Sequence, residues 1–417
     1  MDNSSARKTL RLLQEKEFTL FIFTRFIVIF SLFMQTTAVG YLIYSITKDP
    51  LSLGLVGLAE VIPALGCAFF AGYFVDKMEK RTVYLYCILF YILNAALLTG
   101  LTSDRFMQHA NSHTIEMLIY LAMFLSGIIR AFLAPASFSL LPLLVQRHDI
   151  PQAITWSSTA WLLGSVLGPL CGGLLMAWIG INSTLLISMI CLFLALISIL
   201  YVKKKAVPIT KNLGILKGLA EGFRFVFRSE LILAVLSLDL FAVLFGGAEA
   251  LLPVYSKEIL KVSEVGYGWL RSAHGMGAIC LMFLLAYIPL KKNVGVKLLI
   301  CVAMYGVCII LFGMSTYVWF SFFMLFFAGL FDGVSVVIRH SILQLHTPSE
   351  IKGRVSSINM MFISSSNELG AFESGLTARL MGTVPAVLFG GIMTIMVVIV
   401  TFFKAPQLRK ITLESKP

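Results

Sequence analysis

The sequence predicts an all-α polytopic membrane protein with twelve transmembrane helices in two six-helix halves. Of its 417 residues, 58% are hydrophobic and 13% are charged, whereas soluble proteins carry roughly 25% charged residues. The mean hydropathy is +0.90. Apolar runs of about 20 residues, enough to cross a bilayer, recur along the whole chain. The second half also repeats features of the first, which predicts two halves related by a pseudo-twofold axis.

Twelve apolar segments have the length of a membrane-spanning helix. Their limits are least distinct near Arg147 and Thr347, where the apolar pattern thins. We expect the spans at residues 18–44, 51–75, 82–101, 116–144, 154–179, 182–202, 230–256, 264–290, 295–315, 317–343, 355–380 and 383–404. The predicted halves are therefore residues 1–202 and 230–417, joined by a linker at 203–229.

A shift of 202 residues brings small residues of the two halves into register. Chemistry differs at two of the aligned positions, because Cys171 corresponds to Glu373 and Arg130 to Asp332. The aligned identities are Gly127 with Gly329, Ser139 with Ser341, Gly168 with Gly370, Gly173 with Gly375, and Leu174 with Leu376. One scaffold used twice with different chemistry is typical of a transporter.

The distribution of Lys and Arg predicts the orientation in the membrane. If the N-terminus is cytoplasmic, the inside segments hold about 24 of the 33 basic residues and the outside loops about four. Cytoplasmic loops carry such an excess, so both termini are predicted to be cytoplasmic. We expect no cleavable signal peptide, because residues 1–17 are rich in charged side chains and the apolar run that follows is longer than the hydrophobic region of a signal peptide.

The linker at 203–229 contains a stretch with helical amphipathic spacing. Its second part is expected to form an interfacial helix that tethers the halves. The apolar stripe comprises Leu216, Leu219, Phe223 and Val226, and the charged stripe comprises Lys217, Glu221, Arg224 and Arg228.

The loop after the second span carries a charged motif that runs from Gly72 to Arg81. It resembles the loop signature of the major facilitator superfamily, G-x-L-x-D-[RK]-x-G-[RK]-[RK]. Two positions depart from the signature: Phe74 replaces the leucine, and Glu79 replaces the second glycine, which is expected to weaken the turn. The matching residues are Gly72, Asp76, Lys77, Lys80 and Arg81.

This resemblance implies the superfamily's fold, with Asp76 acting as a latch that holds the two halves in one conformation. Gly72 is expected to allow close packing of helices. The alternative interpretation of the same residues is a positive-inside anchor.

A second motif lies in the fifth span. Gly164 to Gly173 matches g-x-x-x-G-P-x-x-G-G, the signature of this superfamily's proton-coupled exporters. The matching residues are Gly164, Gly168, Pro169, Gly172 and Gly173. Further segments, among them residues 50–60 and 367–375, resemble the bacterial branch that includes macrolide-efflux and enterobactin-exporter-like proteins. The resemblance implies antiport and hence efflux, and the alternative is a close-packed helix with a proline kink.

About ten ionisable residues lie within the predicted spans. Each costs about 2.5–3.5 kcal/mol at a helix centre on insertion scales, so they must face one another or a wet cavity. They are Arg25, Glu60, Arg130, Asp239, Glu249, Arg271, Asp332, Arg339, Glu368 and Glu373. Arg25 and Arg339 are nearer the cytoplasmic ends, where they would be able to reach the interface.

Four of the acidic residues are candidates for proton coupling, because a carboxylate removed from water binds a proton more readily. They are Glu60, Asp239, Glu368 and Glu373. Glu368 and Glu373 are about 140° apart around one helix, so only one of them is expected to face a given cavity. The alternative is structural pairing, such as Glu60 with Arg130 or Asp332 with Arg271. For His274 we expect a polar contact between helices rather than a titrating role.

The sequence therefore predicts a secondary transporter that uses alternating access. The expected function is proton-coupled efflux of a moderately hydrophobic small molecule, a drug of the multidrug type or a siderophore-like compound, by a monomer in the bacterial cytoplasmic membrane. Its partners would be the substrate, protons and the lipid bilayer, with the proton gradient as driving force and no cofactor or metal.

Three alternatives remain open from the sequence: an importer of a nutrient or metabolite, a non-transporting receptor and a membrane-embedded enzyme. For an enzyme the support is weak, because His109 and His113 lie in a polar loop without nearby carboxylates. The net charge of +12 does not indicate nucleic-acid binding, since the basic residues are scattered between apolar runs. The absence of a phosphate-binding loop in the sequence argues against ATP-driven pumping.

Overall fold

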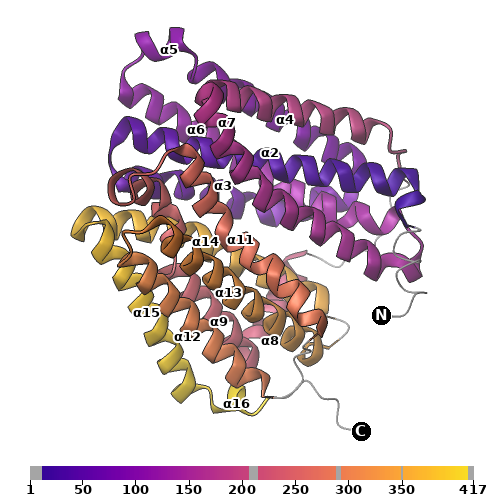
Figure 1. Ribbon diagram of the computed structural model, residues 1–417. Helices are drawn as coiled ribbons and strands as arrows, with labels where there is room; N and C mark the ends of the chain where they lie inside the picture. Colours follow the sequence, from indigo (N-terminus) through magenta and orange to yellow (C-terminus); the bar gives the residue numbers. More distant parts are fainter. Residues whose placement is uncertain (1–11, 206–214, 288–292, 349–350, 412–417) are drawn as a thin grey trace. The chain divides into compact units, whose positions relative to one another are not determined.

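The computed structural model describes residues 12–205, 215–287, 293–348 and 351–411, and these ranges contain helices and no strand (Figure 1). The side chains of Phe69, Tyr73, Asp76, residues 215–220, Ala286, Tyr287, Gly353, Arg354 and Ser357 lie outside the described part as well. The chain divides into two compact units, and α3 contributes to both. Its first turns, with Lys48–Leu58, belong to the second unit and its remainder, from Ala59, to the first.

The first unit contains the helices that precede residue 206. They are η1 (Leu12–Gln14), α2 (Lys16–Thr47), α3 (Pro50–Lys77), α4 (Lys80–Leu101), α5 (Asp104–His109), α6 (Ser112–Leu140), η2 (Leu141–Leu143), η3 (Arg147–Asp149) and α7 (Ile150–Leu200). The long α7 has a non-helical residue at Gly180, with φ 81° and ψ 170°. Only glycine adopts this conformation readily, so α7 consists of two parts on either side of Gly180, which correspond to the predicted fifth and sixth spans.

The second unit contains the helices that follow residue 214. They are α8 (Ile215–Arg228), α9 (Glu230–Phe245), η4 (Ala248–Leu251), α10 (Leu252–Val254), the π-helix η5 (Tyr255–Ile259), α11 (Glu264–Tyr287), α12 (Val294–Gly313), α13 (Val318–His346), α14 (Lys352–Met381), α15 (Thr383–Lys404) and α16 (Pro406–Arg409). Gly382 separates α14 from α15 with φ 94° and ψ 158°. Gly180 and Gly382 are 202 residues apart, so the same glycine break occurs in both units at the offset of the repeat.

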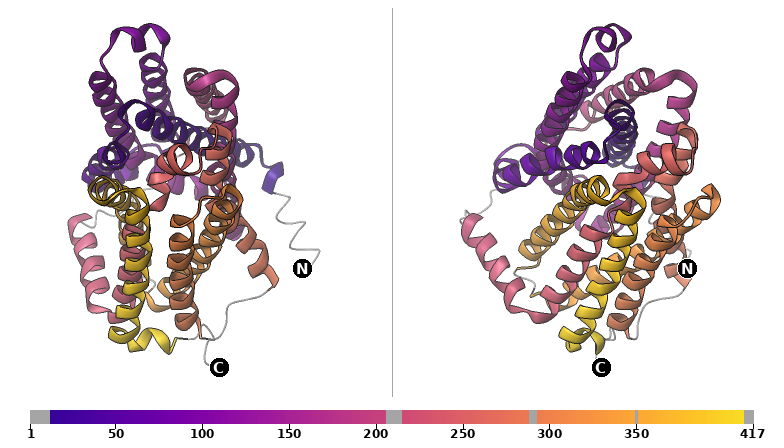
Figure 2. Two further views of the ribbon diagram at one scale, coloured as in Figure 1. Left: turned by 60° about the vertical axis from the view of Figure 1, so that its left-hand side comes forward. Right: turned by 90° about the vertical axis from the view of Figure 1, so that its left-hand side faces the viewer.

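The two units repeat one packing pattern. In the first unit α2 packs against α7, and α4 packs against α6 and α7. In the second, α9 packs against α14 and α15, and α12 packs against α13 and α15. Figure 2 shows the yellow α15 beside the orange α12. Each unit therefore joins its first helix to its fifth and sixth, and its third helix to its fourth and sixth.

Ten helical segments in the described residues are long and apolar enough to cross a membrane. One of them, Arg147–Leu200, contains the break at Gly180. The 30-residue α14 is not among the ten, and it carries Glu368, Glu373 and Arg379. The prediction of an all-helical polytopic membrane protein is confirmed, while the number of twelve spans stays a prediction.

The predicted seventh span, 230–256, is not one continuous helix. Helix α9 ends at Phe245, Gly246 and Gly247 interrupt it, and η4, α10 and η5 follow. The hydroxyl of Tyr305, on α12, donates to the carbonyl of Gly246 at 2.9 Å and satisfies one of the groups freed by the break. Interrupted helices at membrane depth are tolerated where such partners exist, and this one places Glu249 in η4.

Helix α8 forms within the predicted linker and packs against α9 and α14. Val226 is fully buried and Phe223 packs on the same cluster, while Glu221, Arg224 and Arg228 are exposed. The predicted positions Leu216, Lys217 and Leu219 have side chains outside the described residues. The division into halves at 202 and 230 stays a prediction, and Lys48–Leu58 cluster with the second unit rather than the first.

Candidate functional site

The loop between α3 and α4 is held by hydrogen bonds to helix ends. Glu79 is the N-cap of α4, and its carboxylate accepts from the backbone N–H groups of Arg81 at 3.1 Å and Thr82 at 2.7 Å. It also accepts from the backbone N–H of Lys205 at 3.1 Å. Although desolvation opposes the shift, the hydrogen bonds from Thr82, Lys205 and Arg81 lower the pKa of Glu79 below its ordinary value.

The expectation that Glu79 weakens this turn is therefore wrong. Its φ of −67° and ψ of 120° are extended backbone, so no glycine is needed, and its carboxylate stabilises the start of α4.

The two basic residues at the end of the motif bind helix C-termini within the first unit. The Lys80 ammonium donates to the carbonyls of Val75 at 2.5 Å and Met78 at 3.1 Å, at the end of α3. The Arg81 guanidinium donates to the carbonyls of Ile199 at 3.2 Å and Leu200 at 2.8 Å, at the end of α7. Since the last carbonyls of a helix lack the usual partner four residues on, they are available to these side chains, and Lys80 and Arg81 tie the ends of three helices together.

The remaining members of the motif have other surroundings. Lys77 is exposed, and the side chain of Asp76 lies outside the described residues, so its role as a latch stays a prediction. A Cβ built on Gly72 meets no atom within 4 Å. Within the described part of its own unit, Gly72 therefore makes no close helix contact, and its packing role stays a prediction.

The glycine motif of α7 forms a close contact with α2. Gly164, Gly168 and Gly172 lie four residues apart and therefore share one face of the helix. A Cβ on Gly168 would be 2.7 Å from the carbonyl oxygen of Phe30, and one on Gly164 would be 2.9 Å from its backbone nitrogen. A side chain at either position would separate the two backbones. Pro169 and Gly173 are also buried in α7.

The first unit has an ion pair between Glu60 on α3 and Arg130 on α6. The guanidinium Nη1 lies 3.0 Å from the Glu60 Oε1 atom. Gly127 lies one turn before Arg130, and a Cβ there would overlap the backbone carbonyl of Glu60. Gly127 thus lets the two helices approach so that Arg130 reaches Glu60, the pairing that the sequence suggested as a structural alternative.

The second unit has a similar contact between α11 and α13, with His274 in place of Glu60. A Cβ on Gly329 would overlap the backbone carbonyl of His274, and Asp332 follows one turn later. The Nε2 atom of His274 lies 3.4 Å from the Asp332 Oδ2 atom, and its Nδ1 atom lies 2.8 Å from the Glu249 Oε1 atom. Asp332 therefore pairs with His274 and not with Arg271, because the close approach at Gly329 aligns it with His274.

Two offsets relate these contacts. Glu60 and His274 are 214 residues apart, and Arg130 and Asp332 are 202 apart. The charges are inverted: in the first unit α3 supplies the acid and α6 the base, whereas in the second α11 supplies the base and α13 the acid.

The same offsets relate a second pair of contacts, between the first and fourth helices of each unit. Arg25 of α2 donates to the carbonyl of Ser157 at 3.2 Å and to the hydroxyl of Ser137. The corresponding residues of the second unit are Asp239, 214 positions after Arg25, and Arg339, 202 positions after Ser137. Asp239 and Arg339 form an ion pair whose side chains are only 8% and 3% exposed. Arg339 is therefore an intramembrane charge partner, as the sequence predicts, and the alternative that it reaches the interface does not hold.

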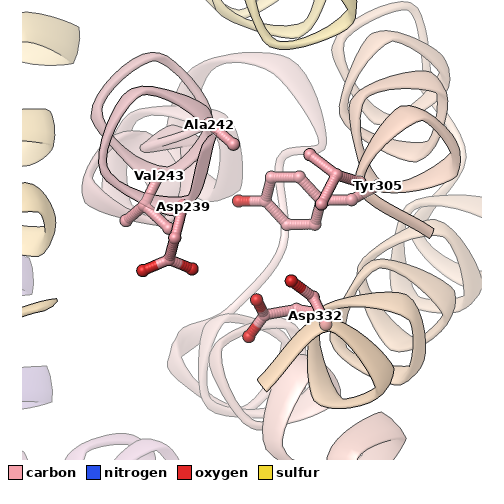
Figure 3. Close-up of a pocket in the computed structure, with 7 residues that line it drawn as sticks. Asp239, Ala242, Val243, Tyr305 and Asp332 are labelled. Atoms are coloured by element: carbon pink, nitrogen blue, oxygen red, sulfur yellow. The ribbon is translucent and has the colours of Figure 1, made fainter. Parts of the chain in front are cut away.

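A small cavity in the second unit adjoins both of its charge clusters. Figure 3 shows the side chains of Asp239, Tyr305 and Asp332 directed toward it from α9, α12 and α13. Its volume is about 10 Å³, about the space that one water molecule needs. Ala242, Val243, Val302 and Ser335 complete the lining.

The last two predicted carboxylates lie on α14. The carboxylate of Glu368 lies beside Gly57, where a Cβ would be 3.3 Å from its Oε2 atom. Glu373 is partly buried. Arg379, near the end of α14, pairs with Asp49 at 3.3 Å. Neither glutamate is among the described residues that line the cavity in Figure 3.

Comparison with known proteins identifies the family. The family described as "transmembrane secretion effector", a branch of the major facilitator superfamily, matches residues 8–417. The chain belongs to this family. The prediction of a major facilitator transporter, made from residues 72–81 and 164–173, is thereby confirmed.

Curated relatives of this transporter are exporters. The enterobactin exporter EntS of Shigella boydii is 26% identical over 343 residues, which cover 80% of this chain and 78% of the relative. The multidrug efflux pump Tap of Mycolicibacterium fortuitum is 24% identical over 394 residues, which cover 91% of this chain and 93% of the relative.

Solved structures share the fold of this major facilitator protein. A POT family transporter in complex with a thioalcohol-conjugated peptide has a TM-score of 0.74 at 13% identity, covering 94% of this chain and 96% of that chain. The nucleoside transporter NupG has a TM-score of 0.70 at 13% identity, covering 93% and 99%. At this identity the likeness concerns the fold.

Sequence reasoning missed the grouping of Glu249 with His274 in this transporter. Glu249 was recognised as an intramembrane charge but not as a candidate for coupling. The signals that point to it are Gly246 and Gly247, which interrupt the span immediately before Glu249, and Gly329, one turn before Asp332.

Proposed function

We propose that this chain exports a moderately hydrophobic small molecule in exchange for protons by alternating access. A multidrug pump and an enterobactin exporter are among the relatives, which supports a lipophilic drug or a siderophore-like compound as cargo. The protein would act as a monomer in the bacterial cytoplasmic membrane, with both termini cytoplasmic, as the distribution of Lys and Arg favours.

The observation that carries the proposal is the set of ionisable side chains inside apolar helices of a transporter. A buried pair such as Asp239 with Arg339 adds little or nothing to stability compared with apolar side chains of similar volume. Ionisable residues at membrane depth are a common mark of ion and proton pathways. Glu60, Asp239, Glu368 and Glu373 remain the carboxylates proposed from the sequence, and Glu60 and Asp239 face guanidinium groups.

A drug-accumulation screen tests the direction of transport. Cells that produce the wild-type chain are compared with cells that produce Asp76→Ala, over a panel that includes ethidium, lipophilic antibiotics and a tricatecholate siderophore. We expect lower accumulation of at least one compound with the wild type than with the variant. Higher accumulation with the wild type would show import, and equal accumulation across the panel would contradict efflux.

Proton coupling is tested separately in sealed vesicles with an imposed pH gradient. Glu368→Gln and Glu373→Gln remove a titratable group and keep the side-chain size. We expect at least one of them to abolish gradient-driven transport while the protein still inserts into the membrane. Normal transport by both single variants and by the double variant would contradict a coupling role for these two residues.

A further inference from the structure

His274 is the only residue in the described part of the chain whose two ring nitrogens each lie near a carboxylate. Nδ1 is 2.8 Å from Glu249 and Nε2 is 3.4 Å from Asp332. A neutral imidazole has one N–H group and one lone pair, whereas a protonated imidazole has two N–H groups. The geometry therefore satisfies both carboxylates only when the ring carries the additional proton.

The equivalent contact in the first unit cannot release a proton in this way. There, Glu60 faces Arg130, and a guanidinium stays protonated in proteins. The buried pair of Asp239 with Arg339 also depends on a guanidinium. Of these three related contacts, only the one at His274 has an imidazole as its base, a group that proteins use in both its protonated and its neutral form.

The charged and titratable groups around His274 come from several elements. Glu249 approaches from η4, Asp332 from α13, and Tyr305 from α12, with its ring centroid 6.4 Å from that of His274. Arg271 and Tyr267 lie on α11 itself. Across the small cavity, Asp239 with its partner Arg339 faces Asp332. The carboxylates outnumber the positive charges unless His274 is protonated, since Asp239, Glu249 and Asp332 then balance Arg271, Arg339 and His274.

Glu249 is the most exposed of the three side chains Glu249, His274 and Asp332. Its side chain is 43% exposed, compared with 24% for His274. Glu249 lies in η4, just after the interruption at Gly246 and Gly247, so it is joined to α9 by a short non-helical segment rather than by a continuous helix. An imidazole placed between two carboxylates favours a proton as the ligand, because only the protonated ring donates to both.

We propose that His274, held between Glu249 and Asp332, is the binding site of the coupling proton. This inference rests on the proposed function, because it adds His274 to the carboxylates proposed above as binding sites for the proton of export. The proton binds to the free ring nitrogen of neutral His274, and the resulting imidazolium donates to both carboxylates. Loss of the proton turns one donor into a lone pair that faces a carboxylate, so one of the two contacts between α11 and its neighbours, η4 or α13, is released.

Nuclear magnetic resonance of the full chain with ¹⁵N-labelled histidine, in lipid nanodiscs, tests the protonation state without a transported compound. The signal that disappears in His274→Gln belongs to His274. We expect both ring nitrogens to carry a proton at pH 7 in the wild type, and one of them to lose it in the double variant Glu249→Gln/Asp332→Asn. The matched control is His346→Gln, whose Nδ1 atom contacts the backbone carbonyl of Ile342, and it should leave the His274 signal unchanged.

A neutral ring at pH 7 in the wild type, or the same protonation state in the double variant, would overturn the site. Transport in everted vesicles with ethidium as the probe then tests coupling. We expect ethidium accumulation driven by a pH gradient to be at least tenfold lower with His274→Gln than with the wild type. Ethidium counterflow, which requires no net proton movement, should be kept. Equal gradient-driven accumulation by variant and wild type would overturn the assignment of the coupling proton. If the wild type itself shows no gradient-driven accumulation while the ring signals are as expected, the proposed function fails and the proton-binding site remains.

Discussion

Replacing one member of the Asp239–Arg339 pair should destabilise the protein far more than replacing both. Their side chains are 8% and 3% exposed, so a charge that loses its partner is largely cut off from water. Breaking a buried pair of this kind costs about 3–5 kcal/mol. Asp239→Leu should cost more than Arg339→Met, because a guanidinium cannot shed its charge, whereas an unpaired carboxylate can take up a proton. The unfolding free energy of the double variant should be within about 1 kcal/mol of the wild-type value or higher than it.

The assay is a detergent-denaturation titration of the purified protein, followed by its helical circular dichroism, with a double-mutant cycle. The chain supplies a matched control in Glu60 and Arg130, where the Arg130 side chain is 40% exposed. For that pair we expect a coupling energy of about 0.2–1 kcal/mol. The reasoning is refuted if the free-energy losses of the single variants at Asp239 and Arg339 sum to the loss of the double variant. It is also refuted if the coupling energies of the two pairs are equal.

Three further predictions concern helix contacts and ends. Gly168→Ala should destabilise the protein by about 1–3 kcal/mol through overpacking, since its Cβ would be 2.7 Å from a backbone oxygen of α2. The control is Gly66→Ala, whose Cβ meets nothing within 4 Å; it should be neutral or stabilising in the same denaturation titration. Gly180→Ala and Gly382→Ala should each cost about 1–3 kcal/mol, because both positions have positive φ, and a cost no larger than that of Gly66→Ala would argue against strain there. The pKa of Glu79 is lowered in the folded protein, so the stability that its carboxylate adds is present above about pH 4.3 and is lost as the pH falls through its lower folded pKa. The difference in unfolding free energy between wild type and Glu79→Gln should therefore shrink in that acid range. A difference that stays constant with pH would exclude the cap.

The helices and their contacts could be predicted well from the sequence, because apolar length and small residues determine them directly. The glycines at 164, 168 and 172 lie against α2 as a small-residue stripe would. The break in the seventh span was missed, since Gly246 and Gly247 lie within an apolar run whose hydropathy is unaffected by them. Depth along a helix left open whether Arg339 reaches the interface, because depth does not show which side of the helix faces the protein.

Pairing of the intramembrane charges could be predicted only in part. Glu60 with Arg130 was foreseen as a structural pair, and it forms. The partner of Asp332 was expected to be Arg271 and is His274, because helix register is set by Gly329 against the His274 carbonyl. Complementary charge alone does not distinguish residues one turn apart on the same helix. The repeat carries this information, since the offsets of 202 and 214 relate the contacts of one unit to those of the other.

Proton-driven export is tested most directly by the sidedness of transport in vesicles of defined orientation. Everted vesicles with an acid interior should accumulate ethidium or another compound identified in the screen, and they should lose it when the pH gradient is collapsed. Accumulation only in right-side-out vesicles with an acid exterior, or accumulation that does not respond to the gradient, would contradict the account.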